Sequence, residues 1–114
     1  MENLKNRIEK GLDTVIRQFE LMVSFKVYIP KIKELENELF SNDKVKSKNG
    51  LKGIESLLSI NRAWMEVISV DVLSDKGNTY KDKFVDNFNN WDEWYNFMEN
   101  IVEDAKKYYA EMFE

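Results

Sequence analysis

Cysteine and histidine, two residue types that carry much of protein chemistry, are both absent from this chain of 114 residues. Without cysteine the chain has no disulfide, no thiolate metal ligand and no cysteine nucleophile. Without histidine it lacks the usual general base near neutral pH and the commonest metal ligand. Zinc chemistry and catalytic triads are therefore excluded, and no remaining pair of side chains has the spacing of an acid-base or nucleophile site. We expect a protein that is not an enzyme and holds no cofactor.

Turn-forming residues and long hydrophobic runs are also scarce. One proline and four glycines accompany 43% hydrophobic and 33% charged residues, which is typical of one compact domain over residues 1–114. The first residues do not resemble a secretory signal, and the longest apolar stretch, 19–29, is interrupted by polar and charged residues and is too short to cross a bilayer. We expect a cytoplasmic protein with no membrane association.

Helical periodicity is what the chain has in abundance. Apolar residues recur at spacings of three and four through most of the sequence. The longest such series is Tyr80, Phe84, Phe88, Trp91, Tyr95, Met98, Val102, Ala105, Tyr109 and Met112. We expect a break near Ile29, because Pro30 follows it, and a flexible linker at about 41–50, where turn-forming residues are densest. The pattern predicts an all-α fold, a four- to five-helix bundle with a long aromatic-rich C-terminal helix.

Two segments also fit β-strands. Apolar residues alternate with period two over about 19–29 and again over about 66–73, and the second segment precedes a possible hairpin turn at 75–77. The residues after that turn do not alternate, and helical spacing describes them better. The alternative fold is therefore α+β, with a small antiparallel sheet from these two segments.

Carboxylates on the predicted C-terminal helix raise the question of a metal site. Asp92, Glu99 and Glu103 lie on one face of that helix. Such carboxylates are usually solvated, and metal sites between helices typically add the histidine that this chain lacks. We therefore expect no metal site.

Lysines around the predicted linker suggest a contact with nucleic acid. Lys44, Lys46, Lys48 and Lys52 could reach phosphates. Arginine is scarce, however, and the formal net charge of the chain is −4, which argues against direct binding to DNA or RNA. We expect these lysines to lie in a solvated loop.

The most distinctive segment is aromatic and acidic, and it contains no Lys or Arg between Phe84 and Ala105. On a helical wheel its apolar sector is about 160° wide, more than a helix facing one neighbour buries. We expect Trp94 and Phe97 to anchor a partner protein and the carboxylates to complement its charge. The predicted partner-binding residues are Asp92, Glu93, Trp94, Phe97, Glu99 and Glu103.

A similar surplus of apolar surface occurs in the first helical region. Leu21, Phe25 and Tyr28 lie opposite its core stripe and are candidates for a dimer contact or a second interface. If one of the two helices lies at the centre of the bundle, however, both of its apolar faces are covered within the chain.

Together these features predict a non-enzymatic protein-interaction module whose acidic, aromatic helix docks on a basic surface of a partner protein. Where that surface normally holds nucleic acid, the protein would act as an inhibitor and DNA mimic, because a row of carboxylates imitates phosphates. Small phage inhibitors fit this description, and the many Lys, Asn, Ile and Glu residues suggest an AT-rich genome such as that of a mobile element. The alternatives are a homodimeric structural or regulatory helical protein and a weak nucleic-acid binder that uses the lysines of 44–52.

Overall fold

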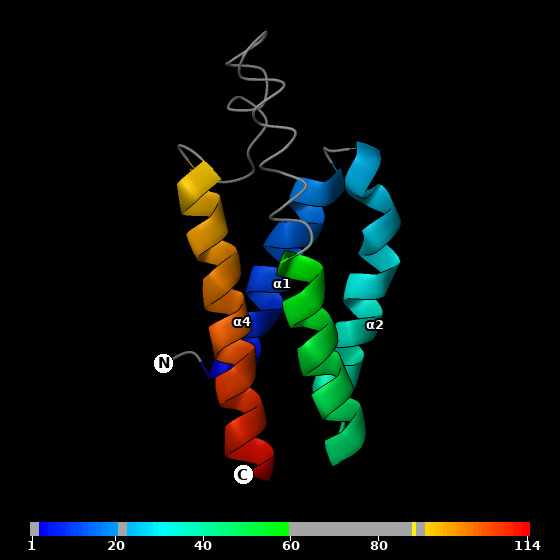
Figure 1. Ribbon diagram of the computed structural model, residues 1–114, viewed down its shortest axis with the longest axis vertical. Helices are drawn as coiled ribbons and strands as arrows, with labels where there is room; N and C mark the ends of the chain where they lie inside the picture. The colour runs from blue at the N-terminus through cyan, green and yellow to red at the C-terminus, as the bar shows by residue number, and fades with distance from the viewer. Residues whose placement is uncertain (1–2, 21–22, 60–87, 89–90) are drawn as a thin grey trace, which may run out of the picture.

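The computed structural model describes residues 3–20, 23–59, 88 and 91–114, and these residues form helices with no strand among them (Figure 1). The elements are the α-helix α1 (Leu4–Glu20), the 3-10 helix η1 (Val23–Tyr28), the α-helix α2 (Ile29–Leu39), a helix over residues 44–59 and the α-helix α4 (Trp91–Phe113). The prediction of an all-α bundle is confirmed. None of the described helices is both long enough and apolar enough to cross a bilayer.

Helix α1 begins with a side-chain cap. The Oδ1 atom of Asn3 accepts a hydrogen bond of 2.8 Å from the backbone N–H of Asn6, which satisfies one of the free donors of the first turn. One face of α1 is buried, because α1 packs against both α2 and α4. Its largest buried apolar side chains are Ile8, Leu12, Val15, Ile16 and Phe19. Helix α1 therefore has neighbours on two sides.

The predicted break near Ile29 is confirmed as the start of α2. Pro30 lies in the first turn of this helix, where its missing N–H is not needed and its fixed φ angle suits the helix. Residues 23–28 form a 3-10 helix, so the alternative strand over 19–29 is wrong. The other segment of the alternative sheet, 66–73, lies outside the described residues.

The predicted flexible linker at 41–50 is shorter in the structure, because the next helix already begins at residue 44. Asp43 is its N-cap: the Oδ1 atom accepts a hydrogen bond of 2.9 Å from the N–H of Val45. The fully buried hydroxyl of Ser47 then donates a bond of 2.7 Å to the carbonyl of Leu39, near the end of α2. The turn is thus limited to residues 41–43, and residues 44–50 are the first turns of the 44–59 helix.

Helix α2 and the 44–59 helix approach each other closely at Gly50. A Cβ atom at this position would lie 2.7 Å from the carbonyl oxygen of Leu35 and 2.8 Å from the Cα atom of Leu39. Only glycine fits such a contact between backbones without moving them. The close crossing fixes how the 44–59 helix runs upward in Figure 1, beside the descending α4.

Candidate protein-interaction site

Trp94 lies in the core, so its predicted role as an exposed anchor is wrong. Its side chain is fully buried, with its ring edge-to-face on Phe88 at 5.2 Å and stacked on Phe97 at 5.7 Å. The wide apolar sector of α4 is covered because α4 has two neighbours, α1 on one side and the 44–59 helix on the other. The surplus of apolar surface expected for α4 is thus reduced within the chain itself.

The other predicted aromatic contacts are half-buried or lie outside the description. Phe97 is half-buried and packs edge-to-face on Phe88 at 5.2 Å. Tyr28 is half-buried against the core. Leu21 lies outside the described residues, as does the side chain of Phe25. The structure therefore does not bring the predicted aromatic anchors together as one exposed patch within its described part.

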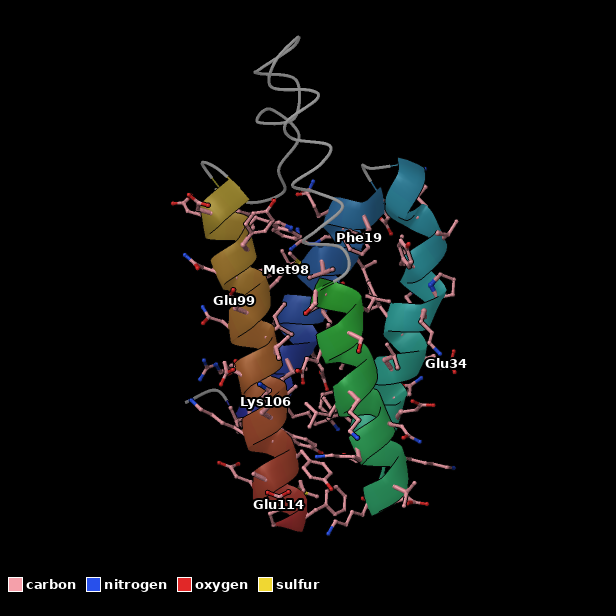
Figure 2. The ribbon with its side chains drawn as sticks, in the orientation of Figure 1. Phe19, Glu34, Met98, Glu99, Lys106 and Glu114 are labelled. Atoms are coloured by element: carbon pink, nitrogen blue, oxygen red, sulfur yellow. The ribbon has the colours of Figure 1, made fainter. Side chains whose placement is uncertain are left out.

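The predicted carboxylates, in contrast, are on the surface. Asp92, Glu93, Glu99 and Glu103 are all exposed on α4, and Glu99 is labelled on this helix in Figure 2. Two of them border a groove of about 300 Å³ between α4 and the 44–59 helix. The groove is lined by Glu55, Leu58, Ser59, Tyr95, Met98, Glu99, Asn100, Val102 and Glu103.

We call this feature the acidic groove. Three exposed carboxylates, Glu55, Glu99 and Glu103, form its rim. Its floor is apolar and consists of buried or half-buried side chains: Leu58, Tyr95, Met98 and Val102. Glu55 cannot be assigned to this site from the sequence, because only the tertiary structure brings the 44–59 helix beside α4. The groove combines a charged rim with an apolar floor, which suits a long basic side chain.

The opposite side of α4 has a different charge. A hollow of about 270 Å³ between α1 and α4 includes Arg7, Lys10, Thr14 and Asp104. There the guanidinium of Arg7 forms an ion pair of 3.2 Å with the largely buried carboxylate of Asp104. This contact links α1 to α4 and neutralises the carboxylate. On this side of α4 the carboxylate is therefore paired with a cation and largely buried, whereas Glu99 and Glu103 are exposed on the side of the acidic groove.

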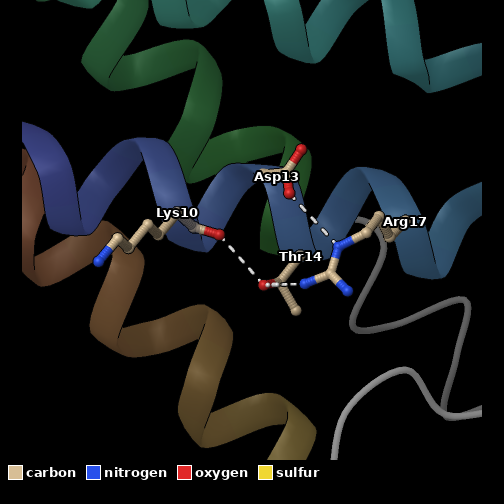
Figure 3. A network of polar contacts seen from close by, with 4 residues as sticks. All are labelled: Lys10, Asp13, Thr14 and Arg17. Atoms are coloured by element: carbon tan, nitrogen blue, oxygen red, sulfur yellow. Dashed lines mark hydrogen bonds and ion pairs between the residues drawn. The ribbon is translucent and has the colours of Figure 1, made fainter.

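The polar contacts within α1 are local and structural. The hydroxyl of Thr14 donates to the carbonyl of Lys10 at 3.1 Å and accepts from Nη2 of Arg17 at 3.1 Å (Figure 3). The Nε atom of Arg17 also lies 3.3 Å from Oδ2 of Asp13. All four residues belong to one helix, and their contacts satisfy the buried hydroxyl of Thr14.

A third hollow, of about 340 Å³, lies between α1 and α2 and contains Glu9, Asp13, Lys33 and Glu36. Burial raises the pKa of Glu36 above its ordinary value of 4.5, the carboxylates of Glu9 and Asp13 raise it further, and Lys33 opposes them. The folded protein therefore keeps this proton to higher pH than the unfolded chain does. It follows that the contribution of Glu36 to the free energy of unfolding falls as the pH rises from 4.5 through the raised pKa.

The lysines expected in a solvated loop lie on the 44–59 helix instead. Lys44, Lys48 and Lys52 follow one another at spacings of four and form a stripe along this helix. The Nζ atom of Lys48 lies 4.7 Å from the centre of the Tyr109 ring, a cation–π contact with α4. These lysines are thus held on a regular surface beside α4.

Among the described residues, no three carboxylates are placed so that they could share a metal ion. The features that describe the acidic groove are its charged rim and its apolar floor. No protein-family model, curated protein or solved structure matches the chain.

Proposed function

We propose that this protein is a non-enzymatic protein-interaction module whose acidic groove docks on a lysine- or arginine-rich surface of a partner protein. The observation that supports this most directly is the convergence of Glu55, Glu99 and Glu103 around one apolar floor. A basic side chain of the partner would lay its methylene groups on that floor and its charged group against the rim. This combination of contacts favours a protein ligand over a free inorganic cation.

The N-terminal part of α4 adds to the negative charge of the acidic groove. The sequence of α4 contains no Lys or Arg before Lys106, and Asp92 and Glu93 are exposed in its first turn. Lys106 pairs with the rim of the groove: its Nζ atom lies 3.5 Å from Oε1 of Glu103. Exposed pairs of this kind are weak and exchange readily for a partner's cation. Long-range attraction between opposite charges also speeds the encounter of two proteins.

A partner surface of this kind often serves to bind nucleic acid. In that case the acidic groove would occupy the positions of phosphates, and the protein would act as a competitive inhibitor that mimics DNA. This finer proposal adds one requirement, namely that docking and nucleic-acid binding by the partner exclude each other. Competition with a short DNA duplex for the identified partner tests it.

The general proposal is tested with a labelled helical peptide that repeats Lys and Arg among Ala, measured by fluorescence anisotropy. We expect binding that weakens strongly between 50 and 300 mM salt, conditions chosen because roughly 0.1 M salt already limits charge interactions to about 10 Å. Glu99→Gln with Glu103→Gln should weaken binding about tenfold, which corresponds to about 1.4 kcal/mol.

The matched control changes the net charge by the same amount away from the groove. Glu20 and Glu34 are exposed on α1 and α2, and Glu20→Gln with Glu34→Gln should leave binding within about twofold of the wild type, under 0.5 kcal/mol. Equal effects of the two double variants would mean that only the overall charge attracts the peptide. No binding by the wild type at 50 mM salt would refute the proposal.

A further inference from the structure

The surface shared by α4 and the 44–59 helix carries opposite charges at its two ends. On the 44–59 helix, Lys48, Lys52 and Glu55 follow at spacings of four and three, so they lie along one stripe. On α4, Glu103 and Lys106 are three residues apart. We call this surface the two-helix face; it consists of the acidic groove together with Lys48, Lys52 and Lys106.

The arrangement along the two-helix face follows from the antiparallel course of its helices. Lys48 contacts Tyr109 near the C-terminal end of α4, whereas Leu58 and Met98 line the groove at the other end. The carboxylates therefore gather toward the N-terminal end of α4 and the lysines toward its C-terminal end. Figure 2 shows this order on α4, where Lys106 lies below Glu99. With a rise of 1.5 Å per residue, the two charge centres are separated by about 8 Å along the helices.

We propose that the two-helix face pairs with the same face of a second copy of this chain, in an antiparallel arrangement about a two-fold axis. The two-fold axis lies in the contact plane and is perpendicular to the helices. It passes level with the midpoint between Lys52 and Glu55. Rotation about this axis brings the lysine end of one copy onto the acidic end of the other. Lys52 then faces Glu55 of the second copy, and Glu103 faces Lys106. Because the interface is isologous, each of these contacts occurs twice.

The presence of both signs of charge on this face favours a second copy as its occupant. The two-helix face carries lysines as well as carboxylates, although the chain as a whole has a net charge of −4. A parallel arrangement would place like charges against each other, whereas the antiparallel arrangement places Lys52 against Glu55 and Glu103 against Lys106. This inference does not depend on the proposed function. The two share the acidic groove, however, so a basic partner and a second copy would compete for it.

Exposed ion pairs each contribute little and are screened by salt, so the expected dimer forms at low ionic strength and high concentration. Sedimentation velocity at about 200 µM protein should show dimer in 20 mM salt and monomer in 500 mM salt, a range over which screening shortens from roughly 20 Å to about 4 Å. A wild type that stays monomeric in 20 mM salt at this concentration would overturn the proposal.

Charge exchange gives the sharper test. One variant carries Glu55→Lys and Glu103→Lys, and the other carries Lys52→Glu and Lys106→Glu; all four positions are exposed, so both variants should fold. Each variant alone should be monomeric in 20 mM salt, and an equimolar mixture should form a heterodimer at least tenfold tighter than the wild-type dimer. Circular dichroism confirms that both variants are folded before mixing.

The control exchanges charge elsewhere. Glu20→Lys with Glu34→Lys has the same net charge as the first variant, and it should dimerise as the wild type does. If this control is also monomeric, or if the mixture of complementary variants associates no better than either alone, the two-helix face is not the contact. Peptide binding measured at low protein concentration, where the chain is monomeric, tests the proposed function separately, so failure of one does not imply failure of the other.

Discussion

Gly50→Ala is a direct test of how closely α2 and the 44–59 helix cross. In an isolated helix the exchange stabilises by about 1 kcal/mol, because alanine loses less conformational freedom than glycine. Here the new methyl group would lie 2.7 Å from the carbonyl oxygen of Leu35 and 2.8 Å from Cα of Leu39. Ordinary contact begins near 3.4 Å, so at least 0.7 Å of separation is needed, and the atoms that must move belong to the backbone of α2.

The expected loss in the free energy of unfolding follows from the energy needed to move the two backbones apart. A gap of 0.5 to 1 Å forfeits roughly a quarter to a half of the dispersion energy at the crossing, and overpacking typically costs about 1 to 3 kcal/mol. We place Gly50→Ala at the upper end, about 3 kcal/mol, since a backbone cannot rotate away as a side chain can. After the gain of about 1 kcal/mol in helix propensity, the expected net loss is about 2 kcal/mol, or roughly 8 °C in Tm.

Urea unfolding followed by circular dichroism at 222 nm measures this loss, and Gly53→Ala is the matched control. Gly53 lies one turn further along the same helix, and its added methyl group would meet the end of the Leu35 side chain, which can change rotamer. We expect Gly53→Ala to lie within about 1 kcal/mol of the wild type. If Gly50→Ala is as stable as Gly53→Ala, the backbone contact described at this crossing is wrong.

Three further changes test other parts of the structure. Ser47→Ala should lower the free energy of unfolding by about 1 kcal/mol, because a buried carbonyl of α2 loses its hydrogen-bond donor; urea unfolding measures this loss. Glu36→Gln should raise the free energy of unfolding at pH 7 relative to the wild type, with the difference vanishing near pH 4, because the raised pKa of Glu36 makes its charged form unfavourable in the folded state; a denaturant series at several pH values shows the trend. In a Trp64→Phe/Trp91→Phe variant, the remaining Trp94 should emit at short wavelength and resist iodide quenching because it is fully buried; exposed-type emission would contradict its place in the core.

Local features of the sequence were enough to predict the helices and several of their ends. Apolar spacings of three and four predict α1 and α4, because one turn of helix brings those positions to a common face. Pro30 predicts the break before α2 for an equally local reason. The turn-forming residues of 41–50 were misread as a longer linker, because Asp43 and Ser47 act as a cap and a tertiary hydrogen bond rather than as loop residues.

The tertiary structure decided which side chains are buried and which helices pack against each other. A helical wheel correctly placed Glu99 and Glu103 on one flank of their helix, but it could not tell whether the apolar flank with Trp94 faces water or a second helix. That outcome depends on α1 and the 44–59 helix both packing against α4, which is a property of residues far apart along the chain. Glu55 joins the acidic groove for the same reason. Periodicity is local and can be read from spacing, whereas the groove exists only because separate helices dock side by side.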